Sequence, residues 1–332
     1  MLLTFLTSVG QWYGRCYGCL LEERTGLLEI KALIDPNRVQ GELSDWMDEK
    51  EGSGNCCEWS GIECDNSTRR VIHLSLKGAY DWSLGDWVLN ASMFLPFKEL
   101  QSLDLSRNGL VGCSENQGLC ELKNLEQLVL AENNLHGSLP DCFRNLSSLQ
   151  LLDVSRNQFT GNIASGPLPN IISLEFISLS NNHFTVPVSM KPFMNHSGLR
   201  FFSGDNSRLV TEPMSFHGLT PKFQLVFFSM SNSSSEDLNV ETPNFLHNQH
   251  DLRVLDLSQN NFIGMFPSWL LKNNTRLEQI FLSENSFDGA LQLQDHPNPD
   301  MITIDISDNN MHGEIPKNIC LIFSNLLTLK DG

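Results

Sequence analysis

Apolar side chains recur along this chain with a period of about 24 residues. The segment from Leu100 to Leu110 sets the pattern, with leucine at its first, fourth, sixth and eleventh positions and asparagine at its ninth. Because the side chains of a strand alternate between two faces, we expect a short strand in each period, with the first, fourth and sixth positions in the core. Segments with this pattern start at Val71, Leu100, Leu125, Leu149, Leu174, Leu199, Leu225, Leu252, Leu277 and Met301.

A period of this length, with leucine and asparagine at fixed offsets, is typical of the leucine-rich repeat. We therefore predict an α/β fold, a right-handed curved solenoid with a parallel sheet on its concave face and a core built from stacked coils. About ten repeats fill residues 67–332, with an irregular part at 199–251. The chain ends inside a strand at Leu326–Leu329, so we interpret the last repeat as incomplete and the chain as truncated at its C-terminus.

Two other positions of the repeat carry a fixed residue type. The ninth-position asparagines are expected to be buried, with their amides bonded to backbone groups of adjacent coils. At the thirteenth position, glycine lets the backbone bend toward the back of the coil. The asparagines are Asn108, Asn133, Asn157, Asn182, Asn260, Asn285 and Asn309, and the glycines are Gly112, Gly137, Gly161, Gly264, Gly289 and Gly313.

Residues 19–66 lack the repeat pattern and are predicted to form an N-terminal cap, because a solenoid must cover the apolar interior of its first coil. An apolar flank predicts a helix that ends at Asp35-Pro36, and Trp46 and Trp59 add bulk to this small unit. The apolar flank consists of Leu20, Leu27, Leu28, Ile30 and Leu33.

Five of the nine cysteines precede the repeats. Adjacent Cys56 and Cys57 cannot readily bond to each other, so the economical pairing is Cys19–Cys56 and Cys57–Cys64. Two disulfide bonds in so small a domain indicate an oxidising compartment. A zinc site is the alternative, but the spacing fits no zinc-finger pattern.

Four cysteines lie among the repeats. Cys120 and Cys142 occupy similar heights in successive repeats and are expected to bridge neighbouring coils. Cys113 is an alternative partner for Cys120, so the pairing of Cys113, Cys120, Cys142 and Cys320 stays open.

The chain begins with an apolar stretch, Met1–Val9. We interpret residues 1–18 as a remnant of a signal peptide, with an ordinary terminus as the alternative. No window contains 18 consecutive apolar residues, so no membrane-spanning helix is predicted. In a secreted protein the six Asn-x-Ser/Thr sequons are candidate N-glycosylation sites, namely Asn66, Asn90, Asn145, Asn195, Asn232 and Asn273.

The cap motif and the repeats together resemble the ectodomain of plant leucine-rich-repeat receptor-like proteins. The motif runs from Cys19 to Cys56-Cys57-Glu-Trp59-Ser-Gly-Ile-Glu-Cys64, and the similarity extends to about residue 329. The resemblance implies extracellular recognition of a peptide, glycan or microbial protein, as in plant defence. It also implies signalling only through partner proteins, with a co-receptor kinase if the full-length form is tethered to a membrane. The location would be the apoplast, or the outer face of the plasma membrane if this chain is a fragment.

The polygalacturonase-inhibiting proteins offer an alternative resemblance, because they share the plant-type repeat, a similar length and a similar cap. This alternative implies a secreted inhibitor of a microbial cell-wall-degrading enzyme. Two features speak against it. Those inhibitors end in a cysteine-bearing cap and tend to be basic, whereas this chain shows no such cap and carries a net charge of −17.

Charge and motifs narrow the function classes further. With 22 Lys plus Arg against 39 Asp plus Glu, the surface repels phosphate backbones, so nucleic acid is not an expected partner. The sequence contains no His-Glu-x-x-His, no Gly-x-Ser-x-Gly and no Walker loop. We therefore expect a non-enzymatic protein without a cofactor or a metal site.

The third position of each repeat should face outward on the concave surface. In five successive repeats this position is apolar, with polar residues at Gln127 and Gln279 on either side. Exposed contiguous apolar surface on a soluble protein usually marks an interaction site, although side chains sunk under a loop would be ordinary core. The predicted ligand-binding stripe consists of Leu151, Phe176, Phe201, Phe227 and Val254.

The fifth position also faces outward and supplies secondary candidates for ligand contact. Most of these side chains are aspartates, which are suited to a basic ligand but more often keep a concave surface hydrated. They are Asp104, Asp153, Asp256, Phe281 and Asp305.

Overall fold

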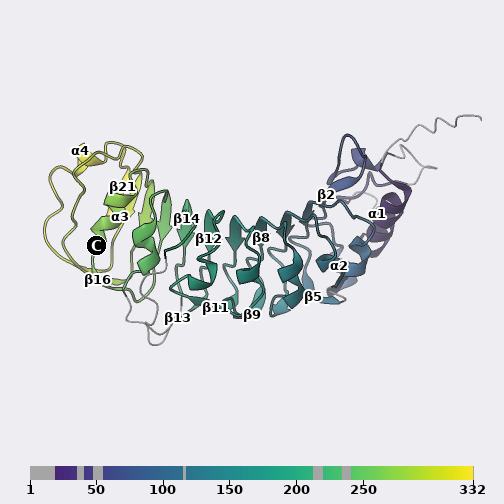
Figure 1. Cartoon of the computed structure of the whole chain (residues 1–332), viewed down its shortest axis with the longest axis horizontal. Helices are drawn as coiled ribbons and strands as arrows, with labels where there is room; N and C mark the ends of the chain where they lie inside the picture. Colours follow the sequence, from purple (N-terminus) through teal and green to yellow (C-terminus); the bar gives the residue numbers. More distant parts are fainter. Residues whose placement is uncertain are drawn as a thin grey trace, which may run out of the picture.

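The computed structural model describes residues 19–35, 41–47, 55–114, 117–211, 220–233 and 241–331. The expected signal-peptide remnant and Cys16 lie outside the described residues, as does part of the irregular stretch. In Figure 1 the described ribbon is an arc of stacked coils that begins with the N-terminal cap. The strands of the main sheet follow the inner side of the arc, which confirms a solenoid with a parallel sheet on its concave face.

Each described repeat adds one short strand to the main sheet, and neighbouring repeats pair in parallel. The cap strand β1 is the exception, because it pairs antiparallel with β2. In spatial order the strands are β1 (Ile62–Cys64), β2 (Val71–Ser75), β4 (Ser102–Asp104), β6 (Gln127–Val129), β8 (Leu151–Asp153), β10 (Phe176–Ser178), β12 (Phe201–Ser203), β14 (Phe227–Ser229), β15 (Val254–Asp256), β17 (Gln279–Phe281), β19 (Thr303–Asp305) and β21 (Thr328–Lys330).

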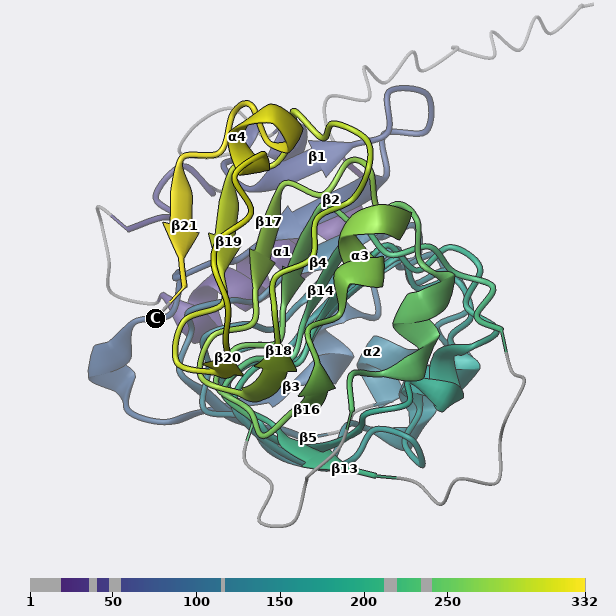
Figure 2. The ribbon, with the colours of Figure 1, turned by 90° about the vertical axis from the view of Figure 1, so that its left-hand side faces the viewer.

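A second set of strands follows the bend after the ninth position and forms three smaller parallel sheets. Figure 2 looks toward the C-terminal end of the stack, with β16, β18 and β20 next to the main sheet and α3 across the coil from it. The sheets contain β3 (Trp87–Asn90) with β5 (Leu110–Ser114); β7 (His136–Gly137), β9 (Gln158–Asn162), β11 (His183–Pro187) and β13 (Arg208–Val210); and β16 (Ile263–Met265), β18 (Ser286–Gly289) and β20 (Asn310–Met311).

Helices complete the coils and the cap. The α-helices are α1 (Leu21–Ile34), α2 (Gln117–Cys120), α3 (Ser268–Asn273) and α4 (Ile319–Ile322), and the 3₁₀ helices are η1 (Cys56–Glu58), η2 (Trp82–Leu84), η3 (Ala91–Phe94), η4 (Asp141–Asn145), η5 (Leu168–Asn170), η6 (Lys191–Phe193) and η7 (Asn244–Asn248). The longest of the described helices, α1, has 14 residues, and none of them combines the length and hydropathy of a membrane span.

The core follows the repeat positions, because the first, fourth and sixth side chains are buried in coil after coil. The repeat at Leu199 departs from leucine at two of these positions, with phenylalanine at the fourth and glycine at the sixth. A Cβ atom added at Gly204 would lie only 3.1 Å from the ring of Phe202, so the larger fourth-position ring occupies the space that a sixth-position side chain fills elsewhere. Phe202 in turn stacks on Phe228 of the next coil, with ring centroids 5.8 Å apart.

The ninth-position asparagine joins each coil to the coil before it. In Asn133, the side-chain Nδ2 donates to the carbonyl of Leu105 in the preceding coil at 3.0 Å and to that of Leu130 in its own coil at 2.9 Å. Its Oδ1 accepts from the backbone N–H of Asn108 at 3.0 Å. The expectation of buried asparagines is confirmed except at Asn285 and Asn309, which make the same bonds but are partly exposed.

The residue before the ninth position, whether that position holds asparagine or serine, adopts the left-handed conformation, with φ between 48° and 60°. This conformation is uncommon for residues other than glycine, and here it recurs at the same position of successive coils. The eighth-position residues are Arg107, Glu132, Arg156, Asn181, Asn206, Asn232, Gln259, Glu284 and Asp308. Most of the thirteenth-position glycines also have positive φ, as expected, but Gly112 does not.

The asparagine ladder is interrupted in the irregular repeats, where Ser207 and Ser233 take the ninth position. The Ser207 hydroxyl is buried and has no hydrogen-bond partner. The Ser233 hydroxyl contacts the carbonyls of Met230 at 3.3 Å and Ser231 at 3.2 Å within its own coil. Neither serine side chain bonds to the preceding coil, so each of these two coils lacks the asparagine bonds to the coil before it, whereas Asn260 of the next coil still bonds to Met230 and Ser233.

The cap confirms a helix followed by a disulfide-bonded segment. Helix α1 buries Leu27, Ile30 and Ile34, whereas Leu20 is 38% exposed and Leu33 is 59% exposed. The predicted apolar flank was therefore wrong at these two leucines, because the buried face of the helix turns toward Ile34. Trp46 and Trp59 are both buried and stack with ring centroids 5.7 Å apart, as expected of residues that fill the cap.

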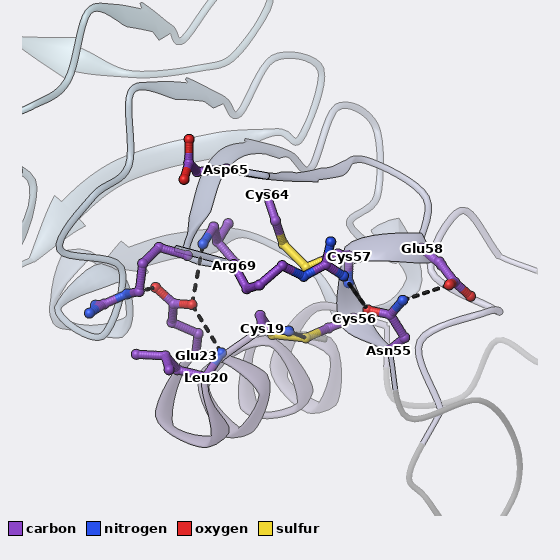
Figure 3. The surroundings of a disulfide bond; sticks show 12 residues. Cys19, Leu20, Glu23, Asn55, Cys56, Cys57, Glu58, Cys64, Asp65 and Arg69 are labelled. Atoms are coloured by element: carbon purple, nitrogen blue, oxygen red, sulfur yellow. Dashed lines mark hydrogen bonds and ion pairs between the residues drawn. A yellow bond between two sulfur atoms is a disulfide. The ribbon is translucent and has the colours of Figure 1, made fainter. Parts of the chain in front are cut away.

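One buried carboxylate joins the cap to the first repeat. Glu23 of α1 is fully buried, and its Oε1 accepts from the Arg70 guanidinium at 2.8 Å. Its Oε2 accepts from the backbone N–H of Val71 at 3.2 Å and from that of Leu20 at 3.4 Å. Figure 3 shows Glu23 between the start of α1 and the first repeat strand, beside the cap disulfides.

The structure contains the expected cap disulfides, Cys19–Cys56 and Cys57–Cys64, shown in Figure 3. It also settles the open alternative among the repeats. Cys120 at the end of α2 bonds to Cys142 in η4 of the next coil. In the described part of the chain, Cys113 and Cys320 remain thiols, and burial raises the pKa of Cys113 to about 11.

A buried histidine lies on the back of the stack, where earlier coils have leucine or isoleucine. His196 is fully buried, with Nδ1 3.1 Å from the carbonyl of Phe193 and Nε2 3.3 Å from that of Leu168. Leu146 and Ile171 occupy this position in the two preceding coils. Burial lowers the pKa of His196, although bonds from its ring to backbone carbonyls act in the opposite direction.

Substitutions at the ninth position should change the free energy of unfolding in opposite directions in two adjacent coils, depending on whether asparagine is removed or introduced. Asn182→Ser removes the Nδ2 bonds to Val154 and Leu179, each 2.9 Å, and should lower the free energy of unfolding by about 1–3 kcal/mol. Ser207→Asn supplies the missing donor and should raise it by about 1 kcal/mol. Urea unfolding followed by circular dichroism measures both; a loss of stability in Ser207→Asn would contradict the account of the interruption.

The buried histidine should make unfolding depend on pH. Because its pKa is lower in the folded state, the unfolded state takes up the proton first, so stability is complete above pH 6.5 and is lost as the pH falls below it. The loss between pH 7.5 and pH 5.0 is at most about 2 kcal/mol for one such group. Thermal unfolding should show a smaller difference between these pH values in His196→Leu, which copies the preceding coils. An unchanged difference would remove His196 as its source.

Candidate functional site

The five residues of the predicted stripe lie side by side on the concave surface. Successive strands pair in register at the third position, so Leu151 is opposite Phe176, Phe176 is opposite Phe201, Phe201 is opposite Phe227, and Phe227 is opposite Val254. All five side chains are partly exposed. The structure therefore brings the stripe together at the surface; that it binds a ligand stays a prediction.

The three aromatic rings of the stripe, here called the phenylalanine stack, lie face to face. The ring centroids of Phe176 and Phe201 are 4.0 Å apart with planes inclined by 10°, and those of Phe201 and Phe227 are 4.2 Å apart with planes inclined by 8°. Each inner ring face is thus covered by the neighbouring ring. The stack therefore presents ring edges to the solvent, flanked by the aliphatic side chains of Leu151 and Val254.

The fifth-position aspartates are held by a serine two residues later. Asp104 and Asp153 accept from the backbone N–H of this serine at 2.8 and 2.9 Å, and Asp256 accepts from the N–H of Ser258 at 2.9 Å and its hydroxyl at 2.6 Å. Phe281 is half-buried in the same row.

Asp305 differs from the other secondary candidates. It is buried, and its Oδ2 accepts from the Lys330 ammonium at 2.8 Å. Burial raises the pKa of Asp305, but the Lys330 and Ser307 hydrogen bonds outweigh burial, so the pKa is lower than usual. Asp305 thus already has a cationic partner from the next coil.

Sequence reasoning missed one acidic residue beside the stack. Asp205 occupies the seventh position, where most repeats have serine. Its Oδ2 accepts from the hydroxyls of Ser180 at 3.0 Å and Ser203 at 2.9 Å, and its Oδ1 accepts from Ser229 and Ser231. The carboxylate therefore connects three coils under the concave surface. The sequence did contain an indication of this role. Asp205 is an aspartate at a position where most repeats have serine, and three successive repeats around it have serine at the fifth position.

A row of exposed amides lies beside Asp205 at the eighth position. Asn206 Nδ2 donates to Asn181 Oδ1 at 2.8 Å, and Asn232 Nδ2 donates to Asn206 Oδ1. Asn232 is also a sequon, so a glycan there would extend from the rim of the concave surface. Of the other sequons, Asn66, Asn90, Asn145 and Asn195 are exposed and Asn273 is half-buried; glycosylation stays a prediction at all six.

The positive charges nearest the stack are paired with their own neighbours. Arg200 lies 3.6 Å from Asp251, and Arg253 lies 2.8 Å from Glu278. Asp256 has a raised pKa because it is partly buried and because the carboxylates of Asp205 and Asp305 are near, although the Ser258 bonds act in the opposite direction. In the ranges that the structure describes, no group of three or more His, Cys, Asp or Glu side chains is arranged to hold a metal ion.

Family models match three parts of the chain. Residues 20–65 match the leucine-rich-repeat N-terminal domain, and residues 98–159 and 251–273 match the leucine-rich repeat. Receptor-like protein 9b of Arabidopsis thaliana is 32% identical and aligns with 98% of this chain and 44% of its own length. Cuscuta receptor 1 of Solanum lycopersicum is 37% identical over 71% of this chain and 21% of its own length. The chain thus spans less than half the length of these relatives.

Solved structures show the same fold. The ectodomain of the Arabidopsis receptor kinase HAESA, in complex with an IDA peptide hormone, superposes with a TM-score of 0.72 at 23% identity and covers 94% of this chain and 53% of that chain. A plant ice-binding protein superposes with a TM-score of 0.61 at 22% identity and covers 94% of this chain and 86% of that chain.

Proposed function

We propose that this chain, which belongs to the plant leucine-rich-repeat receptor-like proteins, is a recognition module that binds a peptide on its concave surface. The observation that carries the proposal is the phenylalanine stack, a partly exposed apolar surface between rows of polar side chains. Aromatic side chains near the centre of an interface commonly supply most of the binding free energy.

The orientation of the rings favours a peptide over a glycan. A sugar typically packs its C–H face on the open face of an aromatic ring, whereas the faces of Phe201 are covered by Phe176 and Phe227. Ring edges suit aliphatic and aromatic side chains, which also gain by edge-to-face contact. The HAESA ectodomain, which shares this fold, was solved with a peptide hormone.

The proposal extends to location and signalling. Three disulfides indicate folding in an oxidising compartment, so we place the protein in the apoplast or on the outer face of the plasma membrane. The repeats carry no catalytic motif, and a signal would therefore pass through a partner, such as a co-receptor kinase beside a membrane-tethered form. We regard the chain as non-enzymatic for the same reason.

Replacement of Phe176, Phe201 and Phe227 by serine should abolish peptide binding while the fold persists. We expect an affinity loss of more than about 100-fold, since each lost aromatic contact costs about 1 kcal/mol or more at an interface. The stacking lost between rings should lower stability by about 1–3 kcal/mol. Binding of a phage-displayed hexapeptide library to the secreted chain, with circular dichroism as the folding check, measures both effects.

Ile172→Ser is the matched control, because Ile172 is 64% exposed and lies outside the strands of the concave sheet. It removes an apolar side chain without touching the stack and should leave peptide recovery unchanged. Equal recovery by the triple variant and the wild type would contradict the proposed function. Inhibition of a fungal polygalacturonase at stoichiometric dose would instead support the inhibitor alternative.

A further inference from the structure

The concave surface around the phenylalanine stack is negative. From Ser102 to Ser307, the third, fifth and seventh positions of the repeats hold five aspartates and no lysine or arginine. At the fifth position, three successive repeats beside the stack have serine, and the repeats on either side of these three have Asp153 and Asp256. Asp205 bonds to the middle one of the three serines, Ser203. An apolar strip is thus bordered by carboxylates.

The nearby cations do not offset this charge, because they are engaged at the rim. Arg200 pairs with Asp251 and Arg253 pairs with Glu278, so each pair is neutral as a unit. Asp205 cannot easily take a further direct partner, since the hydroxyls and N–H groups around it already bond to both of its oxygens. Its charge nevertheless contributes to the potential over the stack.

Asp256 is the carboxylate best placed to meet a ligand. Its Oδ1 is held by Ser258, and among the described residues no lysine or arginine forms an ion pair with it. In the same row, two coils away, Asp305 holds the Lys330 ammonium at 2.8 Å. The row therefore accommodates an ammonium group on an aspartate of this geometry, and the corresponding partner of Asp256 is absent from the described chain.

We propose that the ligand of this surface is a cationic amphipathic peptide, with an apolar side chain on Phe201 and Phe227 and a basic side chain paired with Asp256. The inference rests on the proposed function and names its ligand class. Neighbouring strands lie about 4.8 Å apart and alternate residues of a strand about 6.6 Å apart, which places Phe227 and Asp256 roughly 8 Å from each other. In an extended peptide, side chains two residues apart are separated by about 7 Å, so one short segment spans both contacts.

Charge complementarity also favours this occupant over a neutral or acidic peptide. The net charge of −17 attracts a cation over distance, and the partial burial of Asp256 limits screening of the contact by salt. An acidic peptide would place its carboxylates against Asp153, Asp205 and Asp256, where like charges cannot be separated without losing contact with the stack.

The test uses the secreted full chain with its disulfides intact. Hexapeptides recovered from a random phage library should contain lysine or arginine two residues from an aliphatic or aromatic residue. Asp256→Asn keeps the size of the side chain and an acceptor for Ser258, and it should weaken the recovered peptides by about tenfold or more, as expected for loss of a charge-assisted hydrogen bond. The same peptides with norleucine in place of lysine, or citrulline in place of arginine, should bind both proteins within about twofold of each other.

Asp104→Asn is the matched control, because Asp104 occupies the same position and makes the same bond to a serine but lies three coils from the stack. It should bind like the wild type. Recovered peptides without basic residues, or equal affinity of Asp256→Asn for the basic ones, would overturn the ligand class while peptide binding itself stands. A library without any peptide that needs Phe176, Phe201 and Phe227 would overturn the proposed function as well.

Discussion

Most of the described coils are fixed to the preceding one by a ninth-position asparagine, and the concave surface depends on the register that results. In Asn133, for example, the side-chain amide donates to a carbonyl of its own coil and to one of the preceding coil, and it accepts from a backbone N–H of the preceding coil. A shift between coils would therefore leave buried polar groups without partners. Such groups cost about 1–3 kcal/mol each. Because the coils cannot slide, third-position side chains from different repeats come into line.

Because of this alignment, residues at the same position of successive repeats form one continuous surface. No two residues of the phenylalanine stack are close in the chain, since Phe176 and Phe201 are separated by a whole coil. Their rings meet because parallel strands repeat at about 4.8 Å, a distance close to the 4.0 and 4.2 Å between the stacked ring centroids. At the N-terminal end of the solenoid, the buried Glu23 joins the cap to Val71, the first residue of the first repeat strand.

The features that follow from local spacing could be predicted from the sequence. The core leucines, the asparagine ladder and the stripe depend on alternation along one strand and on a constant period, and the cap disulfides follow from the adjacency of Cys56 and Cys57. Features that depend on several coils at once could not be predicted. Asp205 gains its role from serines of three coils, and the pairing of Asp305 requires Lys330 from the next repeat. The exposure of Leu33 was missed because the helix rotation is set by Ile34, whose burial comes from the tertiary packing.

The two repeats that break the ladder are the ones that supply most of the candidate surface. Ser207 and Ser233 replace asparagine in the coils that contribute Phe201, Asp205 and Phe227. In those coils the bonds lost at the ninth position are accompanied by new bonds at the fifth and seventh positions, where serine hydroxyls converge on Asp205. Natural proteins tend to depart from their own structural rules at functional sites. Simple decay of a repeat would leave the lost asparagine bonds without compensation, whereas here the serine hydroxyls around Asp205 supply other bonds between the coils. The irregularity and the surface are therefore two consequences of one local exchange, in which coil-to-coil bonding moves from the bend to the sheet face beside the stack.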